Sequence, residues 1–407
     1  MTRFGYLVPE FPGQTHAFFW RELRALHDLG YQPEPVSTRR PKQSGTTPDW
    51  ARTLLPGIHY LTPPEPRALA ATSKLSLYGL KHARTLAQAA GLMQPASSRE
   101  VDPRDLLRSA ALFLAGAELA QHAESRGWTH IHVHSCADAA QVALFAHVLS
   151  GITYSMTLHG PLSDYGRNQR QKWSHAKFSV VITEKLLAET RQRLGESMPP
   201  NVRVAPMGVE LSTFSRTSPY SPWDRSGPAR IFSCGRLNPS KGHLELLAAF
   251  RSILDTGMDA ILTIAGEDEL GGRGYRAVVE QAIVQLDLTG RVTLLGAVPE
   301  SRIRDELERT HVFALASHQE PLGVAIMEAM AMEVPVVATS AGGVPDLVLH
   351  GHSGTLVEPG DTDGLAKAVL TTLSNPALAL GMGQRARERL AATYDVRTSA
   401  RALAALI

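Results

Sequence analysis

Residues 317–346, SHQEPLGVAIMEAMAMEVPVVATSAGGVPD, contain the two patterns that decide the fold. From Gly323 to Met332 the residues are apolar nearly all round a helical turn, which is typical of a helix buried against a sheet. The β-branched run from Val334 to Ala338 follows at once and predicts a buried strand. A helix that leads directly into a buried strand is the repeating unit of parallel α/β proteins.

The same alternation of short apolar runs and longer helical patterns extends over the whole chain. Predicted strands are 4–8, 130–133, 153–158 and 179–182 in the first half, and 230–234, 260–265, 292–295 and 312–316 in the second. Predicted helices between them include 16–29, 243–254 and 302–309. A Ser- and Pro-rich stretch at 215–229 separates the two series and predicts a linker. We therefore expect two doubly wound α/β domains that face each other across a cleft.

Length and composition support a two-domain protein of the cytoplasm. The chain has 407 residues, more than a single core usually supports. Cys136 and Cys234 lie far apart inside apolar runs, which indicates a reducing compartment without structural disulfides. No apolar run of about 18 residues predicts a spanning helix, and the N-terminus is unlike a signal peptide. The expected location is the cytoplasm, with peripheral contact to the inner face of the membrane as an alternative.

Basic residues are concentrated in the first half of the chain. The net charge is +2 overall, but it is +7 for residues 1–220 and −5 for the remainder. The stretch from Arg67 to Arg99 carries five Lys/Arg and no acid among Ala and Leu at helical spacing. Such a helix could lie on an anionic bilayer, which would suit a lipid-linked acceptor. A plain helix covering the N-terminal sheet is the favoured alternative.

Two carboxylates in the opening stretch are candidates for ligand binding. Glu328 is the one charge on the apolar helix, and a buried carboxylate needs a partner such as a cation or ligand hydroxyls. Glu320 lies in the loop before the helix, where it could accept hydrogen bonds from sugar hydroxyls. The amides of Leu322, Gly323 and Val324 would face an anion at the helix start. An ordinary salt bridge to a neighbouring arginine remains the structural alternative for Glu328.

A loop with two cations follows a predicted strand in the C-terminal half. Residues 235–242, GRLNPSKG, place Arg236 and Lys241 between a strand and a helix, where they suit a diphosphate. The loop lacks the Gly-Lys-Ser/Thr order of a Walker A loop, and the chain has no Gly-x-Gly-x-x-Gly dinucleotide fingerprint. On its own, the pair of cations is a weak signal.

Together these features resemble the family 4 retaining glycosyltransferases, which have the GT-B fold of two Rossmann-like domains. The resemblance rests on an ordered set of motifs: 235–242, 294–296, Glu320 and Glu328 with seven residues between them, 328–331, 335–339, 342–346 and 354–357. It is fainter before residue 220, where it rests on 207–214. The motifs around 10–15, 132–134 and 158–160 are similar to bacterial exopolysaccharide and colanic-acid-type transferases. The implied domains are 1–218 on the acceptor side and 226–387 for the nucleotide sugar, with a C-terminal helix at 388–407 packing back on the first.

The resemblance implies a role for each matching residue. Arg236 and Lys241 would bind the diphosphate, Glu328 the ribose hydroxyls and Glu320 the hydroxyls of the donor sugar. The amides at 322–324 would hold the distal phosphate or the sugar. His159 would lie near the donor sugar from the opposite domain, and Gly13 would let the first loop approach the phosphates closely. Arg236, Lys241, Glu320 and His159 are the catalytic candidates.

The expected activity is hexose transfer from a nucleotide diphosphate sugar to a glycan or lipid-linked saccharide acceptor in polysaccharide biosynthesis. The resemblance favours UDP as the donor nucleotide, retention of configuration, and a leaving diphosphate that accepts the acceptor's proton. Nucleic acid is not an expected partner. Alternatives are a nucleotide-sugar epimerase or phosphorylase on the same fold, or a degenerate sugar-nucleotide-binding protein. The Pro321-Leu322-Gly323 run replaces the family's common Gly-Phe-Gly, which puts the donor-sugar preference in doubt.

No cofactor or metal is expected. Asp361-Thr362-Asp363 matches an Asp-x-Asp metal motif superficially, but its place before a helix favours a helix N-cap. Asp268 is interpreted as a solvated loop residue. No His/Cys spacing indicates zinc. Histidines 130, 132 and 134 alternate along a predicted strand, so at most one face of that strand could point into a site. For each of these histidines, a place in the core or on the surface is favoured.

Overall fold

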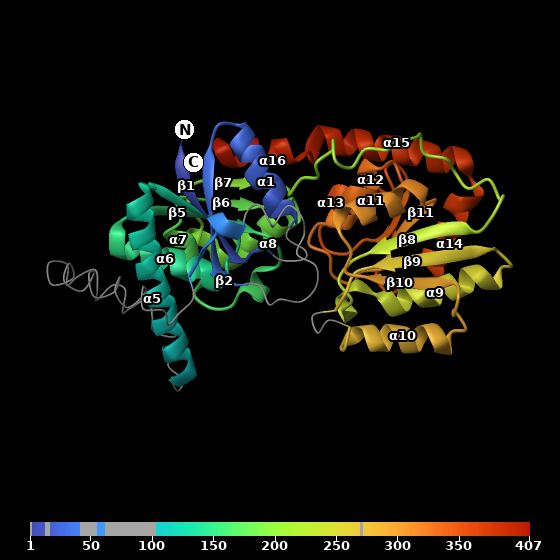
Figure 1. Cartoon of the computed structure of the whole chain (residues 1–407), viewed down its shortest axis with the longest axis horizontal. Coiled ribbons are helices and arrows are strands. Elements are labelled where there is room, and N and C mark those ends of the chain that lie inside the picture. Colours follow the sequence, from blue (N-terminus) through green and yellow to red (C-terminus); the bar gives the residue numbers. More distant parts are fainter. Residues whose placement is uncertain (1, 13–16, 41–54, 62–102, 269–271) are drawn as a thin grey trace. The chain divides into compact units, whose positions relative to one another are not determined.

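The computed structural model describes residues 2–12, 17–40, 55–61, 103–268 and 272–407 (Figure 1). The chain divides into two compact units. The N-terminal unit extends to Pro206 and takes in Ser399–Ile407, and the C-terminal unit comprises Met207–Thr398. Gly13 and the basic stretch 67–99 lie outside the described residues, so the expectations for both stay predictions.

The N-terminal unit contains a seven-stranded sheet in which every paired neighbour is parallel. The strand order is β3-β2-β1-β4-β5-β6-β7. The strands are β1 Arg3–Glu10, β2 Gln32–Arg39, β3 His59–Tyr60, β4 His130–Val133, β5 Thr153–Leu158, β6 Phe178–Val181 and β7 Val202–Val204. The helices are α1 Ala17–Asp28, α5 Pro103–Arg126, α6 Asp138–Ser150, α7 Gln169–Ser174 and α8 Glu184–Leu194, with short 3₁₀ turns η1 Leu55–Gly57, η2 Leu162–Tyr165 and η3 Gly195–Ser197.

Strand β2 is a paired strand in spite of two prolines. Pro33 and Pro35 alternate along it, so their missing N–H groups point to the same side. The amide of Gln32 donates to the Thr2 carbonyl, which places the odd-numbered positions on the side away from β1. Pairing with β3 begins only at Val36. The prolines therefore remove no ladder hydrogen bond.

The C-terminal unit contains a six-stranded parallel sheet, coloured with its helices from yellow-green through orange to red in Figure 1. Its order is β10-β9-β8-β11-β12-β13, so the chain reverses its direction of winding between β8 and β11. The strands are β8 Ala229–Cys234, β9 Ala260–Ala265, β10 Val292–Gly296, β11 Val312–Leu315, β12 Val336–Thr339 and β13 Thr355–Val357. The helices are α9 His243–Asp255, α10 Tyr275–Gln285, α11 Glu300–Arg309, α12 Val324–Ala331, α13 Val344–Leu347, α14 Thr362–Ser374 and α15 Pro376–Thr393, with η4 at Pro239–Lys241; α16, Val396–Ala404, follows.

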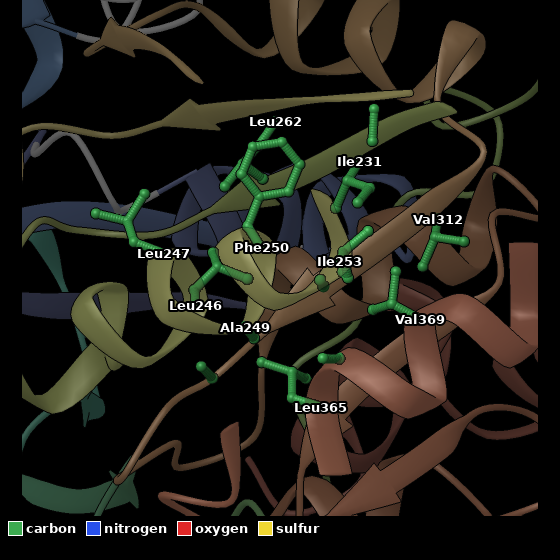
Figure 2. Close-up of a cluster of buried hydrophobic side chains, with 14 of the residues drawn as sticks. Ile231, Leu246, Leu247, Ala249, Phe250, Ile253, Leu262, Val312, Leu365 and Val369 are labelled. Carbon is green, nitrogen blue, oxygen red and sulfur yellow. The ribbon is translucent and has the colours of Figure 1, made fainter. Parts of the chain in front are cut away.

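A continuous apolar core holds α9 and α14 to the C-terminal sheet. Figure 2 shows Phe250 and Ile253 of α9 beside Ile231 and Leu262 of the central strands. Leu365 and Val369 of α14 complete the cluster. Each fully buried side chain of this size contributes about 1.5–3 kcal/mol relative to leaving it exposed. The cluster therefore fixes the strands whose carboxyl ends carry the predicted site.

The segment before the second sheet is anchored rather than free. Val209 forms a bridge with Asp395, and its amide donates to the Tyr394 carbonyl, so residues from Met207 onward belong with the C-terminal unit. The predicted linker 215–229 is also held: Arg216 donates to the carbonyls at the end of α11, and Glu308 accepts from Thr217 and Ser218. The prediction that 215–229 link the two units is therefore wrong, because these residues lie within the C-terminal unit, where residues 216–218 are bonded to the end of α11.

The last residues of the chain pack within the N-terminal unit. Tyr31 donates to the carbonyl of Ala404 at 3.0 Å, and Lys177 donates to the carbonyl of Ile407 at 3.2 Å. Ser399 of α16 reaches Glu22 of α1 at 3.2 Å. These contacts hold residues 399–407 against α1 and other parts of the N-terminal unit.

The two glycines that flank α9 provide a test of the packing at the end of β8. Both have positive φ, +63° at Gly242 and +85° at Gly257, but only Gly242 meets a neighbour, with an added Cβ at 1.9 Å from the Ala316 carbonyl oxygen. We expect Gly257→Ala to cost about 1–2 kcal/mol from backbone strain alone. Gly242→Ala should cost at least about 3 kcal/mol, because β11 and the α9 loop must move apart. Urea denaturation of the two variants measures the difference, and equal losses would contradict the close approach.

Candidate active site

The predicted donor-site residues lie where the C-terminal sheet reverses its strand order. Strands β8 and β11 are paired neighbours, and both end at the carboxyl edge. Ligands of open α/β sheets bind at such an edge, beside the reversal. The loop after β8 carries Arg236 and Lys241, and the loop after β11 carries Glu320. Loops 79 residues apart in sequence thus meet because of the strand order.

Backbone hydrogen bonds join these two loops directly. The amides of His318 and Gln319 donate to the carbonyl of Ser240 at 2.8 and 3.2 Å. Gly242 allows the approach described above, since any side chain there would overlap the Ala316 carbonyl. Because the loops are joined through backbone atoms, their relative position depends little on side-chain rotamers.

Lys241 and Glu320 form the central contact of the site. Lys241 Nζ lies 2.5 Å from Glu320 Oε2, and their side chains are 14% and 9% exposed. Ser317 Oγ approaches the same oxygen at 3.4 Å. A largely buried pair of this kind is held by strong attraction, and removing one partner leaves the other charge poorly solvated. The structure therefore brings together two residues that the sequence had assigned to one site.

The backbone of Glu320 is fixed from the neighbouring strand β12. The Gly343 amide donates to the Glu320 carbonyl at 3.0 Å, and an added Cβ on Gly342 would lie 2.2 Å from that carbonyl oxygen. Gly342 has φ +56°, so a side chain there would also be strained. Thr339 Oγ1 donates to the Ser317 carbonyl at 2.5 Å. The Gly342-Gly343 pair of the sequence motif thus positions the loop that bears Glu320.

Helix α12 starts directly after this loop. Gly323 is its N-cap with φ +98°, and no side chain caps the first amides. The helix is apolar apart from Glu328, as predicted, and it packs on β11 and β12. The amides of 322–324 therefore lie at the helix N-terminus, where their dipoles favour an anion.

Glu328 is buried, at 8% exposure, and lies near the end of β8. Burial raises the pKa of the Cys234 thiol, the negative charge of Glu328 raises it further, and Lys241 opposes the shift. These three residues therefore share one environment at the end of β8. A thiol with so raised a pKa stays protonated and is a poor nucleophile. Arg236 lies on the exposed surface of the same loop.

His159 belongs to the N-terminal unit, just after β5. It is half-buried, and its Nε2 lies 3.2 Å from Nδ1 of His134. His134 Nε2 in turn lies 3.0 Å from Glu22 Oε2. The sequence predicted His159 alone. Glu22 carried no signal of its own, because a single acid on a half-polar helix is usually solvated; the alternating histidines were the one clue to His134.

The other two alternating histidines lie in the core, as favoured from the sequence. His132 is hydrogen-bonded to Ser155 and Thr157, and His130 to Thr153 and Ser155. Burial lowers the pKa of His130 to about 3, and it lowers the pKa of His132 well below the ordinary value, with help from the neighbouring histidines. Both are neutral at physiological pH and serve the packing of β4 on β5.

The acidic motifs outside the site have structural roles. Asp361 is the N-cap of α14 and accepts from the Gly364 amide at 2.8 Å, which confirms the N-cap prediction. Asp268 is 8% exposed and accepts from the amides of Gly272, Gly274 and Arg276. The interpretation of Asp268 as a solvated residue is therefore wrong, because it satisfies the amides that precede and begin α10. Within the described residues, no group of three or more His, Cys, Asp or Glu could hold a metal ion.

Comparison with known proteins identifies the class. Residues 223–389 match the family "Glycosyl transferases group 1". Glycogen synthase of Mycobacterium tuberculosis is 28% identical over 309 residues, covering 72% of each chain. WcaL of Escherichia coli K12, a glycosyltransferase assigned to colanic acid biosynthesis, is 25% identical over 99% of this chain and 98% of its own. The solved structure of Anabaena HepE in complex with UDP and glucose aligns with a TM-score of 0.73 at 18% identity, over 98% of both chains.

The chain has a fold of the GT-B type, as its two parallel sheets and the solved neighbours show. Its C-terminal unit contains a glycosyltransferase group 1 domain, and the chain is a glycosyltransferase. Among the helices that the structure describes, none combines the length and apolarity required to span a bilayer.

The N-cap of α14 gives a test at the Asp-x-Asp motif. We expect Asp361→Ala to lower the free energy of unfolding by about 1 kcal/mol, because the Gly364 amide loses its acceptor. Asp363→Ala, which changes the other acid of the motif, should cost less. Chemical denaturation of both variants measures this. Equal losses, or a larger loss for Asp363→Ala, would contradict the capping role.

Proposed function

We propose that the chain transfers a hexose from a nucleotide diphosphate sugar to a glycan or lipid-linked saccharide acceptor, with retention of configuration, in polysaccharide biosynthesis. The observation that carries the proposal is the contact of Lys241 with Glu320 at the strand-order reversal. A cation for the leaving diphosphate and a carboxylate for sugar hydroxyls are thereby adjacent, as a sugar nucleotide requires. The named functions of WcaL and glycogen synthase support a polysaccharide as product.

In this proposal the donor replaces the internal ion pair. Lys241 and Arg236 bind the diphosphate, and Glu320, released from Lys241, accepts hydrogen bonds from the donor sugar. Glu328 binds the ribose, which offsets the cost of its burial. The amides of Leu322, Gly323 and Val324 stabilise the distal phosphate or the sugar. UDP is our preferred donor nucleotide, because of the resemblance to family 4 glycosyltransferases and because HepE has been solved in complex with UDP.

Retention requires either a carboxylate nucleophile or departure and attack on the same face of the sugar. In the N-terminal unit, Glu22 is linked to His159 through the ring of His134, but both of its oxygens are engaged, one by Tyr6 and His134 and the other by Ser399. We therefore favour front-face transfer, in which the leaving diphosphate accepts the acceptor's proton. Stabilising the charge of that leaving group is the main contribution of the protein. His159 contributes to the same reaction near the donor sugar.

The donor is tested by a panel of UDP-, GDP- and ADP-sugars. We expect a UDP-sugar to raise the melting temperature, because a ligand at about 100 times its Kd stabilises the native state by about 2.7 kcal/mol. Glu328→Gln should lose most of that shift, whereas Asp255→Asn, an exposed change at the end of α9, should retain it. Slow hydrolysis of the same donor then measures turnover. A chain that no donor stabilises would contradict the proposal and favour a degenerate site.

The role of Lys241 is tested by Lys241→Ala. We expect kcat to fall about 100- to 1,000-fold, because the leaving diphosphate loses a cation in a site of low polarity. Arg291→Ala removes a cation from the loop before β10 in the same sheet and should leave kcat unchanged. Thermal unfolding of each variant separates lost turnover from lost folding. An unchanged rate with intact donor binding would disprove the role.

Catalysis without a metal is also part of the proposal. It is supported by the capping roles of Asp361 and Asp268, which leave neither acid available as a metal ligand in this conformation. We expect full activity after EDTA treatment. Loss of activity that Mg²⁺ or Mn²⁺ restores would contradict it.

A further inference from the structure

The carboxyl end of α12 is surrounded by charged side chains that the proposed reaction does not use. Helix α15 packs on α12 (Figure 1), and an added Cβ on Gly383 of α15 would overlap the Glu333 carbonyl at the end of α12. Arg387, one turn further along α15, and Arg216, from the segment before β8, both bond to this end of the helix. Nothing in the sequence motifs assigns a role to Arg216, Glu333 or Arg387.

Backbone amides satisfy the first two of the four carbonyls that end α12. A helix leaves its last four carbonyls without partners inside the helix. The Val334 amide donates to the Ala329 carbonyl at 3.0 Å, and the Glu333 amide donates to the Met330 carbonyl at 3.1 Å. This is the pattern of a Schellman motif, whose turn residue adopts the left-handed conformation. Glu333 is that residue, with φ +55°, a conformation that strains any residue with a side chain.

Two arginines satisfy the other two carbonyls. Arg387 Nη1 donates to the Ala331 carbonyl and also, at 3.1 Å, to the Phe214 carbonyl. Arg216 Nη1 donates to the Met332 carbonyl at 3.2 Å. Both cations thus lie at the carboxyl end of the helix, where the helix dipole favours positive charge. Since they come from α15 and from the segment before β8, they tie α12 to parts of the C-terminal unit outside its neighbouring strands.

The carboxylate of Glu333 lies near both arginines. Its Oε1 is 3.7 Å from Arg387 Nε, and the two side chains are 31% and 29% exposed, so water partly screens the pair. Burial lowers the pKa of the Arg216 guanidinium, and the negative charges of Glu308 and then Glu333 oppose that shift. A residue held in a strained conformation points to a role that glycine could not fill. Here the side chain supplies a negative charge beside two guanidinium groups.

We propose that Arg216, Glu333 and Arg387 are positioning residues that hold α12 for the nucleotide sugar, an inference that rests on the proposed function. The helix has only eight residues, and its hydrogen-bonded turns move together. A shift at its carboxyl end therefore displaces Glu328, one turn away, and the amides of 322–324 at the other end. These groups bind the donor in the ground state and in the transition state alike, so their position affects donor affinity more than kcat.

The hold on α12 is measured first, without substrate, by hydrogen–deuterium exchange of the full-length chain. We expect Arg387→Met to speed exchange about 10-fold in peptides that cover 320–334, because α12 opens locally once its tie to α15 is lost. Peptides from α9 should be unchanged. Arg385→Met is the matched control, since it removes a bond from the same helix to the His352 carbonyl and should leave 320–334 unchanged. Unchanged exchange in Arg387→Met would overturn the proposal.

Substitution of Glu333 separates positioning from stability. Glycine relieves the strain at φ +55°, so the midpoint of urea denaturation should not fall in Glu333→Gly. The KM for the donor should nevertheless rise about threefold, because Arg387 and Arg216 lose a partly screened counter-charge. Glu333→Gln keeps the strain and removes the charge, so it should raise KM by the same factor. An unchanged KM, or a KM that rises only where the midpoint falls, would overturn the role of Glu333.

The kinetic consequence is measured with the donor that the panel identifies. Arg387→Met should raise the KM for this donor and the Kd of its nucleoside diphosphate about 10-fold, with kcat changed less than about threefold. Arg385→Met should leave all three unchanged. A loss of apparent kcat that follows the fraction of unfolded protein, at unchanged KM, would show a structural role and reject positioning. If the wild type transfers no sugar, the proposed function fails, while the exchange measurement still decides whether these residues hold α12.

Discussion

The parallel pairing of β8 with β11 is the constraint on which the candidate donor site depends. These strands are far apart in sequence, and the order of the sheet reverses between them. Their following loops therefore leave the same edge and are joined by the hydrogen bonds from His318 and Gln319 to Ser240. Only then does Lys241 reach Glu320. The apolar cluster of α9 and α14 supports this geometry by fixing the central strands. The electrostatics of the site thus follow from the packing of the sheet.

The N-terminal sheet repeats this arrangement with a different outcome. Its reversal lies between β1 and β4, and it also brings a carboxylate beside an imidazole, Glu22 beside His134. A buried charge requires compensation in both units. Lys241 and Glu320 compensate each other with little further support, so a ligand that offers a diphosphate and hydroxyls can replace each partner. Glu22 has in addition Tyr6 and Ser399, and its charge stays in place. The first pair is therefore suited to ligand binding in the proposed function, whereas Glu22 holds α1 beside β1, the end of β4 and α16.

Much of the fold could be predicted, because buried parallel strands are apolar runs of distinctive length. The predicted bounds of β4, β5 and β9 are those observed. Strand β2 was not predicted, since two prolines normally exclude a paired strand, and only its unpaired side makes them harmless. Likewise, Lys241 and Glu320 could be assigned to one site by resemblance. The contacts of Glu22 could not be predicted, because they depend on β1, the end of β4 and α16 meeting around it, and no local pattern encodes that meeting.

The departure at Pro321-Leu322 acquires a physical meaning in the structure. Leu322 is 1% exposed and packs below the loop, whereas Pro321 is exposed and has no amide to donate. The donors of the α12 start therefore begin at Leu322. Gly323 holds the next turn at φ +98°, a conformation that other residues rarely adopt. The loop is thus restrained at three successive positions before any donor binds. In the proposed function, a site with so restrained a backbone would select its sugar by the placement of Glu320 and of these amides, rather than by the loop adapting to the sugar.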